Sequence, residues 1–361
     1  MKILVLNSIL FTADNNSIPQ VASIKDTMIY NMCLGFKKAG HDVTLAAADE
    51  YRPLNAEKYD FDVLFFRSAL KKIFPPSVLP FSLSLGKYLK QSRNRFDLVV
   101  SSEVFSFPSL FASLLCPGKT VIWHELAVHQ RKFHGLPSRF WYNVVARFFE
   151  RRSLVIPRSG AAGLFIKRYM PRVSADFVDH GINTDNFIYK KEKENQFIVV
   201  AQLIPRKNIS SIIDKFAKFI AKYNLDYQLL IVGRGELRGA LQSQIDTLKL
   251  TGRVVLTGFK SHSELRMLLA DSRAMLVDTL QDDNMVSIPE AIVCGTPVLT
   301  NNIPTTFVAA KGVGVQKEWN EDDIFAMTKN DDMIGRCAVI RKELSNEFLA
   351  DKMIRLWKDQ Y

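Results

Sequence analysis

The segment of greatest chemical interest runs from Asp278 to Val298, where carboxylates precede a short predicted helix. Pro289 suits the first turn of that helix, whose N-terminus presents free N–H groups and a positive dipole end to an anion such as a diphosphate. Glu290, inside the helix, is placed to accept hydrogen bonds from two ribose hydroxyls. Asp282 and Asp283 fit a ligand site or a solvated loop, so the segment alone leaves both interpretations open.

Two adjacent cations, Arg206 and Lys207, follow a predicted buried strand over Phe197–Gln202. Cations at the carboxyl end of a parallel strand are well placed for phosphate, because Arg gives bidentate contacts and Lys a compact charge. A solvated pair on a turn is the alternative interpretation.

The residues at the ends of other predicted strands are weaker indicators of a ligand site. Gly233 and Gly235 follow one strand, but they do not complete a dinucleotide-binding motif, and we expect plain turns there and at Gly258. His124 ends a strand in the first half of the chain and would face the ligand edge of its sheet. A lone histidine at such a position also fits a purely structural role.

Short apolar runs rich in Val, Ile and Leu alternate with amphipathic helical stretches along the whole chain. Continuous runs fit strands buried on both faces, and the repeated strand–helix–strand order predicts parallel sheets. We therefore predict an α/β protein with two Rossmann-like domains that face each other across a cleft. The runs are Ile3–Ser8, Asp42–Ala47, Phe61–Phe66, Asp97–Ser101, Thr120–His124, Leu154–Pro157, Phe197–Gln202, Gln228–Val232, Val254–Thr257, Ala274–Val277 and Pro297–Thr300.

A polar, charged stretch over Lys190–Asn195 marks the predicted boundary between the domains. We place the N-terminal domain at 1–188 and the C-terminal domain at 195–335. The amphipathic pattern near the end predicts a helix within 340–361.

The composition narrows the class of partner. The chain has 361 residues and a formal net charge of +11, and its basic residues concentrate between Leu126 and Arg172. A basic balance predicts an anionic partner, such as a membrane surface or a phosphorylated substrate. No nucleic-acid recognition motif is present, so we expect no nucleic acid.

The four cysteines form no Cys-x-x-Cys pair, and no histidine cluster completes a metal site. We therefore expect free thiols in the cytoplasm and no bound metal or cofactor. No run of about 18 apolar residues predicts a membrane-spanning helix.

Five ordered segments together resemble the retaining glycosyltransferases of family four, which have the two-domain GT-B fold. The resemblance covers nearly the whole chain, and the ordered set is far more specific than any one segment. The segments are 40–44 (GHDVT), 180–187 (HGINTDNF), 231–235 (IVGRG), 255–259 (VLTGF) and 290–298 (EAIVCGTPV).

The resemblance implies that a nucleotide-sugar donor binds the C-terminal domain and an acceptor binds the N-terminal domain. It also implies that the final helix, within 340–361, crosses back to the N-terminal domain. Glu290 would bind the ribose, and Lys207 and the amides near Met285 the diphosphate. Asp282 would hold hydroxyls of the transferring sugar, which His124 would reach from the N-terminal domain. The predicted catalytic residues are His124, Asp282 and Lys207, and the predicted donor-binding residues are Glu290, Arg206, Lys207, Gln202, Asn284, Met285 and Val286, with Gly258 and Phe259 near the base.

The chain departs from the family pattern where the donor would bind. Asp282 stands where the family has glutamate, and its side chain is shorter by one C–C bond, about 1.5 Å. Gln202 stands where the family has arginine, and we expect Arg206 to replace that charge from the next turn.

The resemblance predicts transfer of a hexose from a UDP- or GDP-sugar to an acceptor hydroxyl, with retention and without a metal, in bacterial surface polysaccharide or glycolipid assembly. A catalytically degenerate partner subunit of the same fold is one alternative. A sugar-nucleotide epimerase is another.

Basic and aromatic residues occur together between Arg131 and Arg172, which fits an anionic membrane surface. We therefore expect a peripheral membrane protein that takes a lipid-linked saccharide at the cytoplasmic face. A core helix with a solvated basic face fits the same stretch. The aromatic residues are Phe133, Phe140, Trp141, Tyr142, Phe148 and Phe149.

Overall fold

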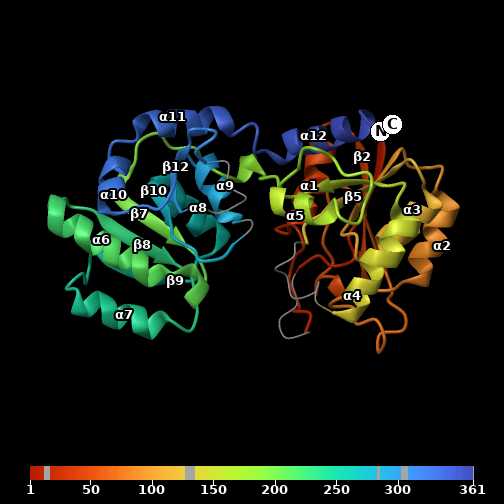
Figure 1. Cartoon of the computed structure of the whole chain (residues 1–361), viewed down its shortest axis with the longest axis horizontal. Helices are drawn as coiled ribbons and strands as arrows, with labels where there is room; N and C mark the ends of the chain where they lie inside the picture. The colour runs from red at the N-terminus through yellow and green to blue at the C-terminus, as the bar shows by residue number, and fades with distance from the viewer. Residues whose placement is uncertain (12–16, 127–134, 283–284, 302–307, 361) are drawn as a thin grey trace. The chain divides into compact units, whose positions relative to one another are not determined.

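The computed structural model describes residues 1–11, 17–126, 135–282, 285–301 and 308–360. The chain divides into two compact units (Figure 1). Unit 1 comprises Met1–Asn183 together with Ser345–Tyr361, and unit 2 comprises Thr184–Leu344. The predicted C-terminal domain, 195–335, lies within unit 2.

Unit 1 is built on a parallel six-stranded sheet of order β3-β2-β1-β4-β5-β6. Apolar clusters cover both faces of this sheet, which explains why its strands are continuous apolar runs. The strands are β1 (Lys2–Leu6), β2 (Asp42–Ala48), β3 (Asp62–Phe66), β4 (Leu98–Ser102), β5 (Thr120–His124) and β6 (Leu154–Pro157).

Most α-helices of unit 1 start at a residue whose side chain caps a free N–H group. At α1 the side chain of Thr27 accepts from the Tyr30 amide, and at α3 Ser106 accepts from the Ser109 amide. The helices are α1 (Met28–Lys38), α2 (Leu83–Ser92), α3 (Phe107–Leu115), α4 (Leu136–Phe140), the π-helix η3 (Trp141–Glu150), α5 (Gly160–Ile166) and α12 (Asn346–Lys358).

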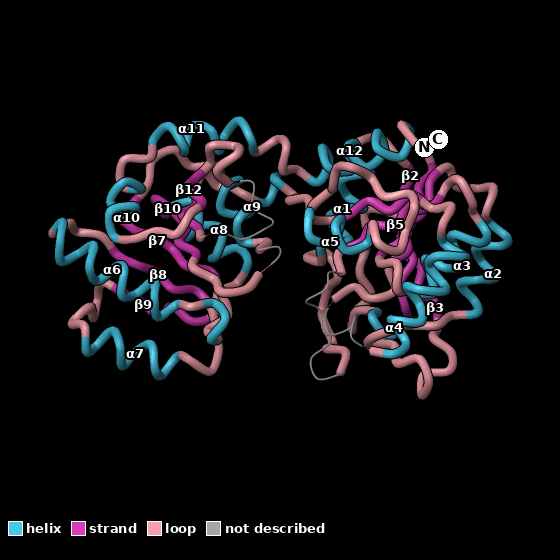
Figure 2. The backbone as a smooth tube through the Cα atoms, viewed as in Figure 1, coloured by secondary structure: helices cyan, strands magenta, loops and turns pink. Residues whose placement is uncertain are grey.

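Helix α12 returns to unit 1 and lies along α1 (Figure 2). The Asn346 amide donates to the Ile182 carbonyl at 2.9 Å, and its side chain donates to the Asn31 carbonyl at 2.7 Å. A Cβ atom on Gly35 or Gly181 would overlap the Asn346 backbone. The close approach of these backbones explains the glycine in the 180–187 segment.

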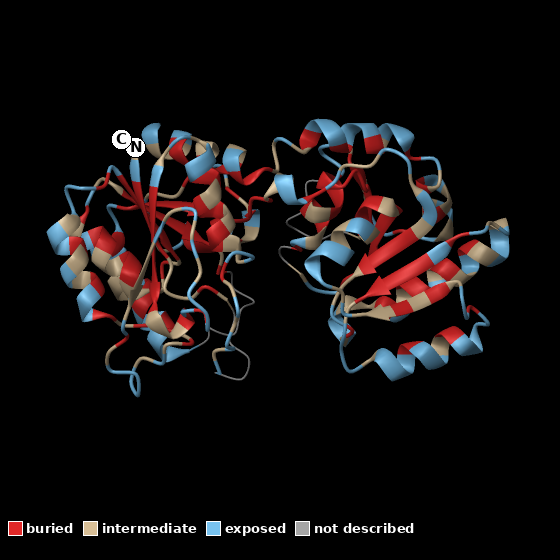
Figure 3. Cartoon of the chain, turned by 180° about the vertical axis from the view of Figure 1, so that it is seen from behind, coloured by how far each residue is buried: buried red, intermediate tan, exposed pale blue. Residues whose placement is uncertain are grey.

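Unit 2 repeats the same topology in the sheet β12-β11-β10-β7-β8-β9, again parallel throughout. Its strands are buried while the outer faces of its helices are exposed (Figure 3). The strands are β7 (Glu194–Val200), β8 (Gln228–Val232), β9 (Val254–Gly258), β10 (Ser272–Val277), β11 (Val298–Thr300) and β12 (Gly314–Gln316), and the helices are α6 (Ile209–Tyr223), α7 (Arg238–Thr247), α8 (His262–Asp271), α9 (Ser287–Val293), α10 (Glu321–Met327) and α11 (Asp331–Ile340).

The predicted fold class, α/β with two Rossmann-like domains, is confirmed by these sheets. In each, the chain reverses its direction of strand addition once, between β1 and β4 in unit 1 and between β7 and β10 in unit 2. Ligands of open parallel sheets bind at the carboxyl ends of the strands beside such a reversal. In the described part of the chain, no helix is both long and apolar enough to cross a membrane.

Candidate functional site

At the reversal point of unit 2, the loop after β7 meets the loop after β10. The Lys207 ammonium pairs with the Asp282 carboxylate, and Arg206 Nη1 lies 3.3 Å from the same oxygen, Oδ2. The Arg206 carbonyl accepts from the Leu280 amide at 2.8 Å and from Thr279 Oγ1 at 3.0 Å. The structure therefore brings together three residues that the sequence predicted for the donor site. Asp282 lies about 75 positions along the chain from the two cations.

Asp278 anchors this arrangement from behind. It is buried, and its Oδ2 accepts hydrogen bonds from Asn208 Nδ2 at 3.3 Å, Ser211 Oγ at 2.7 Å and Lys215 Nζ at 2.7 Å. Asn208 has a left-handed backbone, with φ of 49°, directly after Lys207. Asp278 thus fixes the start of α6 against the end of β10 and holds Lys207 in place. Sequence reasoning gave Asp278 no role.

Gly233 and Gly235 do more than form a turn. A Cβ on Gly233 would overlap the Ala201 carbonyl oxygen, and one on Gly235 would overlap the Leu203 carbonyl oxygen. The Leu203 amide also donates to the Arg234 carbonyl at 3.0 Å. The loop that carries the two cations therefore packs directly on backbone that only glycine permits. The expectation of plain turns was too simple at these two positions.

Glu290 lies on α9 and is partly buried. Burial raises the pKa of its carboxyl group to about 7, and the positive charge of Arg266 opposes that rise only in part. No described residue donates a hydrogen bond to this carboxylate. A carboxylate with spare acceptor capacity suits hydroxyl donors such as those of ribose.

The remaining predicted donor residues occupy varied positions. Gln202 is exposed, Met285 is buried and Val286 is 43% exposed. Phe259 follows Gly258 at the carboxyl end of β9 and is 70% exposed, which leaves its ring available for stacking. Asn284 lies outside the described residues. The roles of these residues stay predictions.

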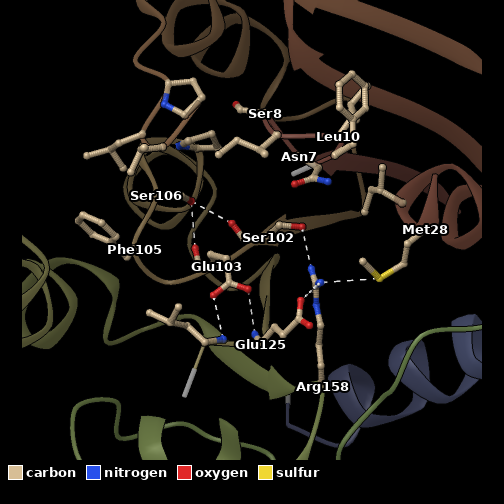
Figure 4. Close-up of a pocket in the computed structure, with 18 residues that line it drawn as sticks. Asn7, Ser8, Leu10, Met28, Ser102, Glu103, Phe105, Ser106, Glu125 and Arg158 are labelled. Carbon is tan, nitrogen blue, oxygen red and sulfur yellow. Dashed lines mark hydrogen bonds and ion pairs between the residues drawn. The ribbon is translucent and has the colours of Figure 1, made fainter. Parts of the chain in front are cut away.

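Unit 1 has a pocket of about 370 Å³ at its own reversal point, beyond the ends of β1, β4, β5 and β6 (Figure 4). Apolar residues such as Leu10, Leu79 and Phe105 line part of it. Glu103 and Glu125 supply carboxylates. Acidic groups and an apolar wall therefore share one small cavity.

Glu103 is held in a fixed orientation. Its backbone is left-handed, with φ of 65°, and its carboxylate accepts from the amides of Glu125 at 2.9 Å and Leu126 at 3.3 Å. His124 Nδ1 lies 2.9 Å from Glu103 Oε2. Burial acts to raise the pKa of Glu103, but the charge and hydrogen bond of His124 outweigh it and the pKa is lowered.

His124 itself is fully buried, with its ring stacked at 6.0 Å on Phe165. It does not line the pocket of unit 1. Its predicted contact with the transferring sugar stays a prediction, while the structure shows it supporting Glu103.

Arg158 joins the other side of the pocket. Its Nη1 donates to Glu125 Oε2 at 2.9 Å, its Nη2 donates to Ser102 Oγ at 3.2 Å, and its guanidinium lies 3.9 Å from the Trp123 ring centroid. Burial acts to raise the pKa of Glu125, but His180 and Arg158 lower it to about 2. Glu125 is therefore ionised at neutral pH.

Sequence reasoning missed Glu103, Glu125 and Arg158. A signal was present, because each follows directly on the carboxyl end of a strand: Glu103 on β4, Glu125 on β5 and Arg158 on β6. In the part of the chain that the structure covers, no three His, Cys, Asp or Glu residues gather in a group that could hold a metal ion.

Two family models match the chain. "Glycosyltransferase Family 4" matches residues 26–186, and "Glycosyl transferases group 1" matches residues 182–311. Over 125 residues the chain is 31% identical to the O-antigen chain mannosyltransferase RfbU of Salmonella typhimurium. That match spans 35% of this chain and 35% of the relative.

Solved structures match over almost the full length. A glycosyltransferase from Rickettsia africae gives a TM-score of 0.66 at 13% identity, covering 99% of this chain and 98% of that one. HepE of Anabaena, in complex with UDP, gives 0.64 at 14% identity, covering 99% and 100%. WaaG, a glycosyltransferase involved in lipopolysaccharide biosynthesis, gives 0.59 at 13% identity, covering 97% and 98%.

The two sheets and these likenesses define the GT-B fold of glycosyltransferases. The two family models overlap at residues 182–186 and together match residues 26–311, which makes the family assignment specific. The chain belongs to the group 1 glycosyltransferases.

The raised pKa of Glu290 predicts a pH-dependent stability. Between about pH 4.5 and 7 the folded state keeps a proton that the unfolded state loses, so stability falls as pH rises through this window. Glu290→Gln has no such proton to lose. Its stability relative to the wild type should therefore rise by about 1–3 kcal/mol between pH 5 and pH 8, measured by urea unfolding.

Glu318→Gln makes the same chemical change on an exposed residue of unit 2 and serves as the control. If Glu290→Gln and the control show the same pH dependence, the Glu290 carboxyl does not titrate as the structure indicates.

Proposed function

We propose that the chain transfers a hexose from a UDP- or GDP-sugar to an acceptor hydroxyl, with retention at the anomeric carbon, in bacterial surface polysaccharide or glycolipid assembly. The observation that carries this proposal is the meeting of Lys207, Arg206 and Asp282 at the reversal point of unit 2. The names of similar proteins support it: RfbU is an O-antigen chain mannosyltransferase, and HepE is solved with UDP and glucose.

In the proposed reaction the leaving diphosphate gains negative charge as the glycosidic bond breaks. Lys207 and Arg206 are fixed at the strand ends where that charge would grow, which lowers the barrier electrostatically. Loss of one such partner should reduce the rate by roughly 10²–10³, by analogy with oxyanion donors. Lys207 and Arg206 would stabilise the negative charge of the diphosphate without a metal ion, and we propose a metal-independent reaction.

Asp282 has two states in this proposal. Without donor it pairs with both Lys207 and Arg206. When the diphosphate takes the two cations, the carboxylate is released and can accept hydrogen bonds from hydroxyls of the transferring sugar. Glu290 would bind the ribose, and the amides near Met285 and Val286 would bind the diphosphate.

The donor site predicts selective stabilisation by a nucleotide. UDP or GDP should raise the Tm of the wild type, and the rise should persist in EDTA. Lys207→Ala and Glu290→Ala should lose it, because one removes the diphosphate contact and the other the ribose contact. Lys218→Ala, on the exposed side of α6, is the matched control and should keep it.

The same experiment separates the alternatives. A folded protein that no nucleotide stabilises would contradict the proposal and favour a catalytically inactive partner subunit. An epimerase would bind the nucleotide as well, but it would convert the sugar on the nucleotide instead of transferring it, which product analysis by mass spectrometry and NMR distinguishes.

We further propose that the protein works in the cytoplasm, docked on an anionic membrane, with a lipid-linked saccharide as acceptor. Exposed apolar side chains on α4 and η3 lie among exposed arginines: Phe140 is 61% exposed, Phe148 63% and Phe149 51%. Such a surface suits both the lipid interface and its negative charge. The exposed basic residues nearby are Arg139, Arg147, Arg151, Arg152, Lys167 and Arg168.

Three residues of the predicted basic and aromatic stretch are buried and do not belong to this surface. Trp141 and Tyr142 are buried in the core of unit 1, because they lie on the inner face of η3. Arg158 is also buried, where it pairs with Glu125. Arg131, Lys132 and Phe133 lie outside the described residues.

The membrane proposal predicts binding to anionic vesicles. The double variant Phe148→Ser/Phe149→Ser should sediment with phosphatidylglycerol vesicles at least about 10-fold more weakly than the wild type, because each buried Phe contributes about 1.5–3 kcal/mol. Val339→Ser removes an exposed apolar side chain of unit 2 and is the control. A wild type that binds neither anionic nor neutral vesicles would refute the docking proposal.

A further inference from the structure

The pocket of unit 1 offers a ligand negative charge but little positive charge. Glu103 and Glu125 both line it, with side chains 30% and 39% exposed. Arg158 is the one cation among its described lining residues, and its side chain is only 6% exposed. Both acidic side chains are therefore partly open to the pocket, whereas the guanidinium is enclosed.

Both terminal nitrogens of Arg158 are engaged, while its Nε is buried without a partner. Its Nη1 binds Glu125, its Nη2 binds Ser102, and one face lies on Trp123. Figure 4 shows the guanidinium between Ser102 and Glu125, with both bonds drawn. Because the Arg158 side chain is only 6% exposed and its charge is paired with Glu125, it offers little attraction to an anionic ligand.

Glu103 has acceptor capacity left. An ionised carboxylate has about four lone-pair positions. In Glu103, three of these positions are occupied by contacts with the Glu125 amide, the Leu126 amide and His124 Nδ1. These bonds lock the group in one orientation and leave room for one further donor, which a ligand hydroxyl would supply.

The rest of the lining suits a sugar ring. Asn7, Ser8 and Ser106 are polar, while Leu79 and Phe105 are apolar. A hexose presents hydroxyls at its edge and C–H groups on its face, so it can use both kinds of wall. The cavity volume, about 370 Å³, lies within the range of about 300–1,000 Å³ that is usual for small-molecule pockets.

We propose that Glu103 and Glu125 select an uncharged, hydroxyl-rich sugar as the acceptor end that enters this pocket, and reject acceptor ends that carry a carboxylate or phosphate there. The inference rests on the proposed transferase function and names the acceptor class. Attraction comes from the hydroxyls that Glu103 binds, and discrimination comes from like-charge repulsion in a partly dry cavity.

The test compares acceptors that differ only at C6. Octyl glucoside, galactoside and mannoside are each paired with the corresponding octyl hexuronide, and kcat/KM is measured with the donor nucleotide-sugar that the protein binds. The wild type should prefer the neutral member of a pair by about 10-fold or more. Glu103→Gln should shrink this preference by about 10-fold, chiefly by raising kcat/KM for the hexuronide.

The preference is the ratio of kcat/KM for the neutral glycoside to kcat/KM for the hexuronide, both measured on one preparation. Any loss of folded protein cancels in this ratio, so a merely structural role of Glu103 would not change it. Glu347→Gln makes the same chemical change on an exposed position of α12 and should leave the ratio unchanged. Ligand-observed NMR of the same pairs measures the selection without a donor, so failure of the transferase proposal and failure of this inference remain distinguishable.

Equal or better binding and transfer of the hexuronide would overturn the inference. So would a wild type that binds nucleotide but none of the neutral glycosides. A preference for the neutral sugar that Glu103→Gln abolishes and Glu347→Gln keeps would establish it.

Discussion

The pairing of Asp282 with Lys207 and Arg206 ties together the two loops that form the proposed donor site. The Lys207 and Asp282 side chains are only 10% and 15% exposed, so each charge needs a partner when no ligand is present. Behind them, Asp278 fixes the start of α6, and beside them Gly233 and Gly235 let the loop after β7 press on that after β8. The two cations are thus held in place in the absence of a ligand.

The two units carry sites of opposite character at equivalent places in the same topology. At the reversal point of unit 2, two cations meet one carboxylate. In the pocket of unit 1, two carboxylates meet one enclosed cation. On the proposed assignments, one fold would therefore separate an anionic donor from a hydroxyl-bearing acceptor by charge. The Rossmann order of the strands supplies the position, and the residue that follows each strand supplies the chemistry.

Much of the fold was predictable from the sequence because buried parallel strands are continuous apolar runs. The predicted strands all occur, but β12 was missed, since three residues beginning with Gly314 give no such run. The cluster of Lys207, Arg206 and Asp282 was predictable through ordered motifs of the family. Its ion pairing was not, because neither motif nor spacing records which side chains meet across loops.

The pocket of unit 1 was hidden for a related reason. Arg158 counted as one more cation of a basic stretch, whereas the structure buries it against Trp123 and Glu125. His124 was expected to face a ligand, yet the left-handed backbone of Glu103 brings that carboxylate to the pocket and leaves the histidine behind it. Left-handed backbone at a non-glycine residue is a tertiary feature that composition does not reveal.

The most direct measurement is the affinity of UDP and GDP for the wild type and Asp282→Asn by isothermal titration calorimetry. If the diphosphate takes the cations that Asp282 holds, removing the competing charge should tighten binding of the preferred nucleotide by about 10-fold, while Lys207→Ala added to Asp282→Asn should abolish the gain. Unchanged or weaker binding in Asp282→Asn, with the protein folded, would contradict the assignment of these cations to the diphosphate.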